Sequence, residues 1–372
     1  MRIVGITEPV YGPEALQSVA QQAKDTPYTE VGKDALAWEC MDSTNVETKT
    51  FYMTSDDGHI GLVQVIYSNV MGIRTTAQFS SKILSKEPGQ PHLWASDNVS
   101  NFSFSKDMQN FKADGCSMDL SEDGTSYTIK SSTNKSSIVD LKFTQTTPGF
   151  VAGKNGTSTF GTDPKKPWGR MKHIFWPRCQ VEGTILTQKE KGPVDFKGRG
   201  MFVHALQGMK PHFAAAKWNF ANFQSPSFSA ILMDFVTPKS YGESVVAVGG
   251  IVTEGGMLVG GASPAVSAKH TEVKGDPDND WPEPGAAAFT WTGKSPDGKD
   301  VTATLEGGIL PRVDRVDVMG ELPKFVKQIV AGAAGTKPYI YQYTPKLKVK
   351  VNIGGEEKEE EGQLFMEATF IS

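Results

Sequence analysis

The feature that most constrains this chain is a recurring alternation of apolar and polar residues with a period of two. It is clearest in Lys346–Ile353, where Leu347, Val349 and Val351 share one face and lysines occupy the other. Such alternation is typical of an antiparallel strand with one buried face and one wet face. Because segments of this kind recur with short turns between them, we predict an all-β fold of sandwiches or barrels with few short helices.

Turn residues mark the ends of the predicted strands. A hairpin is predicted at residues 55–58, where Gly58 suits a tight turn between strands at 50–53 and 59–67. Further strands in the first half are predicted at 72–84, 99–104, 117–120, 126–131, 137–146, 181–187 and 196–206. In the second half they are predicted at 228–237, 244–253, 257–261, 286–291, 301–306, 347–353 and 363–371. The acidic run at 356–361 is predicted to be a solvated hairpin tip.

Two segments have the periodicity of a helix instead. Residues 13–24 place Leu16, Val19 and Ala23 on one face, which predicts a short docking helix. Residues 323–333 align five apolar side chains. For that segment we expect a helix packed over a barrel end, and a helix that touches a membrane is the alternative.

The length of the chain indicates more than one folding unit. At 372 residues it exceeds what a single hydrophobic core usually serves. We predict an N-terminal arm with a short helix at 1–35, a first β domain at 36–206 and a second at 207–372.

Composition and cysteine usage exclude several classes of protein. A formal net charge of −4 argues against a dedicated nucleic-acid binder. Cys40, Cys116 and Cys179 are an odd, widely spaced set without a CxxC pair, so we expect reduced core thiols and no disulfide framework. The first residues have no secretory signal pattern, and no apolar run approaches the ~20 residues of a spanning helix.

Motifs for metal, phosphate or nucleophilic chemistry are missing from the sequence. It contains no HExxH, Cys/His cluster or GxSxG elbow. The glycine pairs at 249–250 and 260–261 lack both GxGxxG spacing and a Walker lysine. We therefore predict no catalytic motif, no metal and no cofactor, and the residues favour binding over chemistry.

The segment from His173 to Gln224 concentrates aromatic rings and polar groups. Large aromatic walls with a few hydrogen-bonding groups describe a cavity for a small molecule. The alternative is a structural network that buries a corner between two domains, with each polar group satisfied internally. The candidate ligand-binding residues are Phe175, Trp176, Arg178, His204, Gln207, Trp218 and Asn219.

A basic cluster precedes this segment and has two interpretations. It consists of Lys165, Lys166, Arg170 and Lys172, with Trp168 among them. One interpretation is a solvated loop whose charges are offset locally. The other is a surface that docks transiently on anionic lipid head groups, where each cation contributes about 1 kcal/mol.

Long motifs along the chain resemble those of the fungal survival factor 1 family. They are PVYGPEAL at 9–16, TPYTE at 26–30, MDSTNVETKTFY at 41–52, FGTDPKKPWG at 160–169, FWPRC at 175–179, HALQGMKPH at 204–212, GDPDNDWPEP at 275–284, RVDRVDVMGELPKFVKQIVAGAAGTKPYIYQY at 312–343 and ATFIS at 368–372. The resemblance implies two lipocalin-like β domains. It also implies ceramide binding, non-vesicular transfer from endoplasmic reticulum to Golgi, and a role in survival under oxidative stress.

The same resemblance implies a cytoplasmic or nuclear protein that associates peripherally with Golgi and endoplasmic reticulum membranes. Members of the family usually carry an amphipathic helix before the EPVYGPEA segment, whereas here only MRIVGIT precedes it. That is under two helical turns, so we expect weaker attachment through the N-terminus.

Three functions stay open at the level of the sequence. The first is a soluble, monomeric carrier of ceramide or a similar apolar small molecule, in which buried methylenes supply affinity and polar groups supply selectivity. The second is a lipocalin-like enzyme of the cyclase or hydratase type, which needs only a shaped cavity and a few hydrogen bonds. The third is a stress-linked interaction protein whose cavity is empty.

Overall fold

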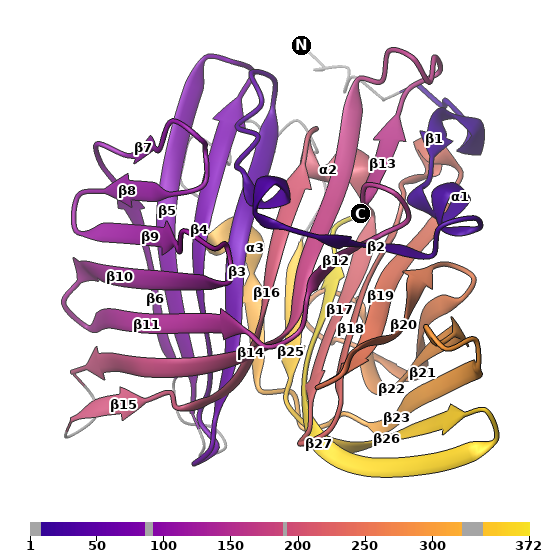
Figure 1. The fold of residues 1–372 in the computed structure, drawn as a ribbon. Helices are drawn as coiled ribbons and strands as arrows, with labels where there is room; N and C mark the ends of the chain where they lie inside the picture. The colour runs from indigo at the N-terminus through magenta and orange to yellow at the C-terminus, as the bar shows by residue number, and fades with distance from the viewer. Residues whose placement is uncertain (1–8, 86–91, 189–191, 322–337) are drawn as a thin grey trace.

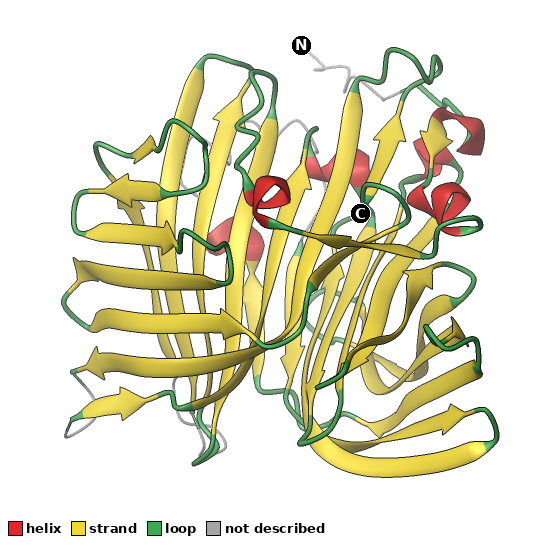
Figure 2. Cartoon of the chain, in the orientation of Figure 1, coloured by secondary structure: helices red, strands yellow, loops and turns green. Residues whose placement is uncertain are grey.

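Two curled antiparallel sheets lie side by side in the computed structural model, which describes residues 9–85, 92–188, 192–321 and 338–372 (Figures 1 and 2). The first sheet follows the order β6-β5-β4-β3-β16-β14-β11-β10-β9-β8-β7, and the second follows β20-β19-β18-β17-β27-β26-β23-β22-β21. Helices are short. The predicted all-β class is confirmed.

The first sheet is built mainly from long hairpins. Its main strands are β3 (Asn45–Ser55), β4 (Ile60–Val70), β5 (Arg74–Leu84), β6 (Leu93–Val99), β7 (Ser103–Phe104), β8 (Phe111–Ala113), β9 (Cys116–Leu120), β10 (Ser126–Asn134), β11 (Ser137–Gln145), β14 (Gly169–Thr187) and β16 (Gly198–Gln207). Smaller strands flank them: β1 (Leu16–Gln17), β2 (Tyr28–Val31), β12 (Gly149–Ala152), β13 (Thr157–Phe160) and β15 (Pro193–Asp195).

The second sheet has a similar curl. Its strands are β17 (Lys217–Gln224), β18 (Ser229–Val236), β19 (Val245–Thr253), β20 (Gly256–Ala262), β21 (Val266–Gly275), β22 (Pro282–Lys294), β23 (Asp300–Gly308), β26 (Lys346–Ile353) and β27 (Glu356–Phe370), with β24 (Asp314–Asp317) and β25 (Tyr339–Tyr343) beside β27. The helical turns are η1 (Pro13–Ala15), α1 (Val19–Ala23), η2 (Lys33–Leu36), α2 (Pro211–Ala214), η3 (Lys239–Tyr241) and α3 (Val318–Glu321).

Each sheet encloses its own apolar core. In the first, Phe51, Tyr127 and Phe202 pack with ring centroids 4.7–5.2 Å apart. In the second, Phe289 and Trp291 are buried, and the indole Nε1 of Trp291 donates a hydrogen bond to the carbonyl oxygen of Ile231 at 3.0 Å. Aromatic residues dominate both interiors, and their large buried area stabilises each curled sheet.

A third apolar cluster joins the two sheets. Tyr52 of β3 stacks on Phe220 of β17 with centroids 4.8 Å apart and also contacts Phe365 of β27 at 5.1 Å. The strands that meet here are therefore buried on both faces, which explains why β3 shows little exposed surface. The change of sheet falls between Gln207 and Lys217. The division into domains at 206 and 207 stays a prediction.

Several local predictions were wrong. Residues 13–24 form η1, β1 and α1 instead of one helix, because Leu16 and Gln17 pair with β13 and the Ser18 side chain caps α1. The acidic run at 356–361 is the start of strand β27, paired with β26, and the tip is formed by the two glycines Gly354 and Gly355 at positive φ.

The segment predicted as a strand at 99–104 contains a bend instead. β6 ends at Val99, and Asn101 adopts a φ of 54° before the short β7 begins. An asparagine tolerates this left-handed conformation better than most residues, which permits the turn. The helix predicted at 323–333 lies outside the described residues.

Candidate functional site

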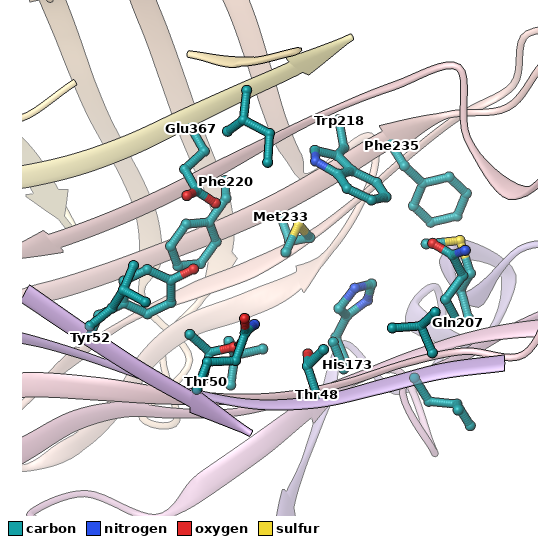
Figure 3. A pocket seen from close by; sticks show the side chains of 18 of the residues that line it. Thr48, Thr50, Tyr52, His173, Gln207, Trp218, Phe220, Met233, Phe235 and Glu367 are labelled. Carbon is teal, nitrogen blue, oxygen red and sulfur yellow. The ribbon is translucent and has the colours of Figure 1, made fainter. Parts of the chain in front are cut away.

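A cavity of about 270 Å³ lies where the two sheets face each other (Figure 3). Strands β3, β4, β14 and β16 provide one wall, and β17, β18 and β27 provide the other, with β24 and β25 alongside. The lining residues are Val46, Thr48, Thr50, Tyr52, Leu62, Gln64, Trp94, Met171, His173, Val203, Ala205, Leu206, Gln207, Trp218, Phe220, Met233, Asp234, Phe235, Val316, Ile340, Gln342 and Glu367.

Strand alternation explains which side chains reach the cavity. On β3, Thr48, Thr50 and Tyr52 line it, whereas the intervening Lys49 and Phe51 are buried inside the first sheet. Most of the lining is apolar, and the polar or charged side chains among it are Thr48, Thr50, Gln64, His173, Gln207, Asp234, Gln342 and Glu367. This combination is the usual character of a site that binds an apolar small molecule and fixes its orientation.

One end of the cavity holds His173, Gln207 and Trp218 (Figure 3). Burial, with a smaller contribution from His204, lowers the pKa of His173 to about 4. The imidazole is therefore neutral at physiological pH and can both donate and accept a hydrogen bond. This end offers polar contacts without a net charge on the ring.

The other end of the cavity holds Tyr52 and Glu367 (Figure 3). The side-chain amide of Gln342 lies between Glu367 and the buried Lys82. Gln342 Nε2 donates to Glu367 Oε1 at 2.6 Å, and Gln342 Oε1 accepts from Lys82 Nζ at 2.6 Å. Burial raises the pKa of Glu367, and Gln342 and Lys82 oppose that rise. Nearby, Gln64 Nε2 donates to Thr50 Oγ1 at 2.6 Å.

Two of the seven residues predicted to bind ligand lie in this wall. They are Gln207 at the end of β16 and Trp218 on β17. Phe175 lies in the apolar cluster between the sheets, with its ring 5.4 Å from that of Phe150. Trp176 points into the first core, where its ring lies 5.2 Å from that of Tyr127.

The other three predicted residues take part in hydrogen-bonded contacts away from the cavity lining. Arg178 is buried, and its guanidinium donates to Ser225 O at 3.1 Å, to Ser229 Oγ at 2.9 Å and to Pro226 O. It thereby ties β14 to the turn that joins β17 and β18.

His204 and Asn219 have equally specific partners. His204 Nε2 lies 2.7 Å from Glu47 Oε1 inside the first sheet. Asn219 donates through Nδ2 to Asp234 at 3.0 Å, and its Oδ1 lies 2.7 Å from His270 Nε2. These contacts match the structural network that was the alternative interpretation of the aromatic and polar segment.

Sequence reasoning missed the residues of β3 and β27 that line the cavity. Thr48 and Thr50 resemble ordinary residues of an amphipathic strand, so no local signal sets them apart. Glu367 has one: it is a single acidic residue within the apolar run LFMEATFI at 364–371. A carboxyl at such a position is costly to bury, which points to a specific role.

The basic cluster divides into two pairs of residues. Lys165 and Lys166 are exposed on the loop between β13 and β14. Arg170 forms an ion pair with Glu39, and Lys172 Nζ lies 3.0 Å from the same carboxylate. The first pair is therefore available to an anionic surface, whereas the charges of the second are offset within the protein.

In the part of the chain that the structure describes, no group of three or more His, Cys, Asp and Glu side chains is placed to hold a metal ion. Cys40, Cys116 and Cys179 are free thiols, and the last two are buried. No helix within the described ranges has the length and apolar character needed to cross a membrane.

Known proteins share both the sequence and the fold. A sequence model of the Svf1 family matches residues 1–372. Ceramide-binding protein svf-1 of Neurospora crassa is 57% identical over 373 residues, which cover 100% of this chain and 97% of the relative. Ceramide-binding protein svf1 of Aspergillus fumigatus is 55% identical, with 100% and 98% covered.

Solved structures are similar in fold at low sequence identity. CghA with Sch210972 has a TM-score of 0.57 at 11% identity, with 93% of this chain and 99% of that chain covered. Kievitone hydratase from Nectria haematococca has a TM-score of 0.55 at 14% identity, with 98% of each chain covered. This likeness concerns the fold alone, and the fold is lipocalin-like as predicted. The resemblance drawn from the motifs is confirmed by the full-length match, and the chain belongs to the Svf1 family.

Proposed function

We propose that this chain binds ceramide in the cavity between its two sheets. The observation that carries the proposal is an apolar-walled cavity with separate polar groups, in a chain 57% identical to a ceramide-binding protein. Ceramide has hydrocarbon chains, an amide and hydroxyls, so it requires both an apolar wall and neutral hydrogen-bonding groups. Tyr52, Thr48, neutral His173 and Gln207 supply such groups.

The energetics assign different roles to the two kinds of contact. Shielding ~30 methylenes at about 0.8 kcal/mol each far exceeds what a few hydrogen bonds contribute, so the apolar wall supplies affinity and the polar groups supply selectivity. The cavity volume of about 270 Å³ lies below the roughly 300–1,000 Å³ of typical ligand pockets. A two-chain lipid therefore extends beyond the cavity or separates its walls.

The finer proposal is a carrier that moves ceramide without vesicles from the endoplasmic reticulum to the Golgi and so supports survival under oxidative stress. Transfer requires a transient contact with a membrane. The exposed cations Lys165 and Lys166 and the partly exposed Trp168 have the composition of such a docking surface. Peripheral association with these two membranes, from a cytoplasmic pool, belongs to the same proposal.

A second candidate function is an enzyme that acts on an apolar small molecule. The observation that favours it is that a neutral imidazole and a carboxyl, those of His173 and Glu367, line the same cavity. Two such groups can hold or move a proton at a bound molecule. The carrier ranks first because the apolar wall with neutral polar groups and the similarity to ceramide-binding proteins both favour it.

Mass spectrometry of lipids extracted from the purified protein tests the carrier. The chain is produced in a fungal host as wild type, as Thr48→Trp, which fills the cavity, and as Thr302→Trp, which places the same ring on the exposed face of β23. We expect near-stoichiometric ceramide with wild type and Thr302→Trp, and a loss of about tenfold or more with Thr48→Trp. Equal ceramide in all three proteins, or none in wild type, would contradict the proposal.

A further inference from the structure

Glu367 is a carboxyl within an otherwise apolar part of the second sheet. Its neighbours on β27, Met366 and Ala368, are buried, and Tyr52 and Phe220 line the same end of the cavity. Figure 3 shows the Glu367 side chain at this end, away from His173. Such a position is unfavourable for a carboxylate unless a partner offsets its charge.

The nearest cation does not pair with this carboxylate directly. Lys82 Nζ forms an ion pair with Asp314, and it donates to Gln342 Oε1 at 2.6 Å. Among the residues that the structure describes, the hydrogen-bond donor to Glu367 is the neutral amide of Gln342, whose Nε2 lies 2.6 Å from Glu367 Oε1. Within the same ranges no lysine or arginine forms an ion pair with Glu367, and no hydrogen bond reaches its second oxygen, Oε2. We take Oε2 as the atom that a donor group of a ligand would contact.

Tyr52 and Glu367 line the same end of the cavity (Figure 3). Burial raises the pKa of Tyr52, and the Glu367 carboxylate adds to the effect. The two groups therefore form one polar corner, with a hydroxyl that donates and a carboxylate that accepts. Thr50 lines the cavity beside them.

We infer that Glu367 allows the cavity to bind protonated long-chain amines of the sphingoid-base class in addition to ceramide. The ammonium group donates to the Glu367 carboxylate and forms the direct ion pair that no lysine or arginine of the described residues makes with it. The Tyr52 and Thr50 hydroxyls contact the hydroxyls of the base, and its hydrocarbon chain lies along Phe220 and Met233. The inference rests on the proposed function, because both ligands occupy the same cavity.

Two further observations agree with an amine. A sphingoid base has one hydrocarbon chain where ceramide has two, so it suits a cavity of about 270 Å³ better. Lys82 is paired with Asp314, and the Gln342 amide lies between Lys82 and Glu367, so an ammonium group can contact the Glu367 carboxylate without displacing an ion pair. A phosphorylated lipid would instead place its anion beside Glu367, and we expect the cavity to exclude it.

Binding of sphinganine and of N-acetyl-sphinganine distinguishes the two ligand classes, because acetylation removes the charge and leaves the long chain unchanged. The proteins are wild type, Glu367→Gln, which keeps the shape and the contact with Gln342, and Glu357→Gln, an exposed control on the same strand. For wild type and the control we expect sphinganine to bind at least about tenfold tighter than its acetylated form. Glu367→Gln should abolish that preference and leave N-acetyl-sphinganine binding within about twofold of wild type.

Each other outcome has a definite meaning. If wild type binds N-acetyl-sphinganine and ceramide but not sphinganine, the amine site is refuted and the ceramide proposal stands. If wild type prefers sphinganine but Glu367→Gln keeps that preference, the assignment to Glu367 is overturned. If wild type binds no sphingolipid, both proposals fail. The comparison of two ligands on wild type stays decisive even if the variant folds poorly.

Discussion

At the scale of single residues, the partner of a buried polar side chain decides its role. His173 and His204 lie on the paired strands β14 and β16, yet they have different roles. His204 is held by Glu47 within a closed core, whereas His173 lines the cavity and forms no ion pair with any residue that the structure describes. Both are histidines of the same aromatic and polar segment. The sequence therefore does not distinguish their roles, and only the structure does.

The neutral state of His173 predicts a pH dependence of stability. In the unfolded chain the imidazole binds a proton below its ordinary pKa of 6.5, but in the folded protein burial lowers that pKa to about 4. The unfolded state therefore gains protons first, and folding stability falls as the pH drops through this window. Relative to His173→Gln, wild type should lose about 3 kcal/mol of unfolding free energy between about pH 7 and pH 4.

Urea unfolding of both proteins at several pH values measures this difference, since the contributions of other groups cancel. If the unfolding free energies of wild type and the variant changed in parallel with pH, His173 would titrate normally and face water.

Arg178 predicts a second effect at this scale. Replacing it by methionine leaves the carbonyls of Ser225 and Pro226 and the hydroxyl of Ser229 without their donor. We expect a loss of about 3 kcal/mol in unfolding free energy, with Arg178→Lys recovering only part because an ammonium cannot span three acceptors. Lys142→Met, at an exposed ion pair, should cost less than about 1 kcal/mol in the same urea titration. Equal losses of unfolding free energy in Arg178→Met and Lys142→Met would contradict the role of Arg178 as a donor that ties β14 to the turn between β17 and β18.

The structure brings only some of the candidate site residues together in the cavity wall. Gln207 and Trp218 lie in the cavity wall, but Trp176 points into the first core. On β14 the register against β16 shifts between Trp176 and Cys179, so the face that each side chain occupies depends on the pairing of the strands. A bulge of this kind leaves no pattern in the composition of the segment.

At the scale of elements, periodicity located most long strands but not their contacts with the N-terminal arm. Residues 33–40 form a strap across the first sheet. Lys49 Nζ donates to the Leu36 carbonyl at 2.6 Å, and the Glu47 carboxylate accepts from the backbone N–H groups of Glu39 and Cys40 at 2.8–3.1 Å. The strap therefore replaces water as the partner of two buried charged groups on β3.

Removing the charge of Glu47 should loosen the strap. In Glu47→Gln the side chain keeps its shape, but one acceptor becomes a donor that faces backbone N–H groups or His204. We expect a loss of about 2 kcal/mol in unfolding free energy and faster hydrogen exchange at the amides of Glu39 and Cys40. Glu122→Gln, on an exposed turn, serves as the control. Unchanged exchange at these two amides would contradict the account.

The pair β24 and β25 is a second element whose position depends on distant contacts. It belongs to the second sheet, yet Asp314 pairs with Lys82 of β5, and His92 Nε2 donates to the carbonyl of Val313 at 2.7 Å. The donor is assigned to Nε2 because His92 Nδ1 accepts from the backbone N–H of Ser85. These contacts hold Val316 and Ile340 against the cavity.

Breaking the ion pair should speed the release of a bound lipid. Asp314→Asn leaves the Lys82 ammonium, which is 1% exposed, without its counter-charge, at a cost of about 3 kcal/mol. We expect the release rate of a fluorescent ceramide to rise about tenfold or more, because the wall formed by β24 and β25 opens more readily. Asp300→Asn, at an exposed pair with Lys294, should leave the rate unchanged. Equal rates in the two variants would show that this wall does not control release.

At the scale of the whole molecule, the cavity results from packing two sheets that are far apart along the chain. Thr48, Thr50 and Tyr52 line it from one side and Glu367 from the other, more than 300 positions later in the sequence. The two-sheet, all-β architecture followed from strand periodicity and length. The cavity could not be predicted in the same way, because no local sequence pattern indicates which outer face of one curled sheet packs against the other.

We propose above that ceramide occupies this cavity between the sheets. The most direct measurement is photo-crosslinking with a ceramide that carries a diazirine in its acyl chain, followed by mass spectrometry of the labelled peptides. The account predicts adducts on the lining residues of β3, β16, β17 and β18, such as Thr48, Ala205, Phe220 and Met233, and their loss in Thr48→Trp. Adducts on residues that face the two closed cores, such as Phe51 or Phe289, would contradict it.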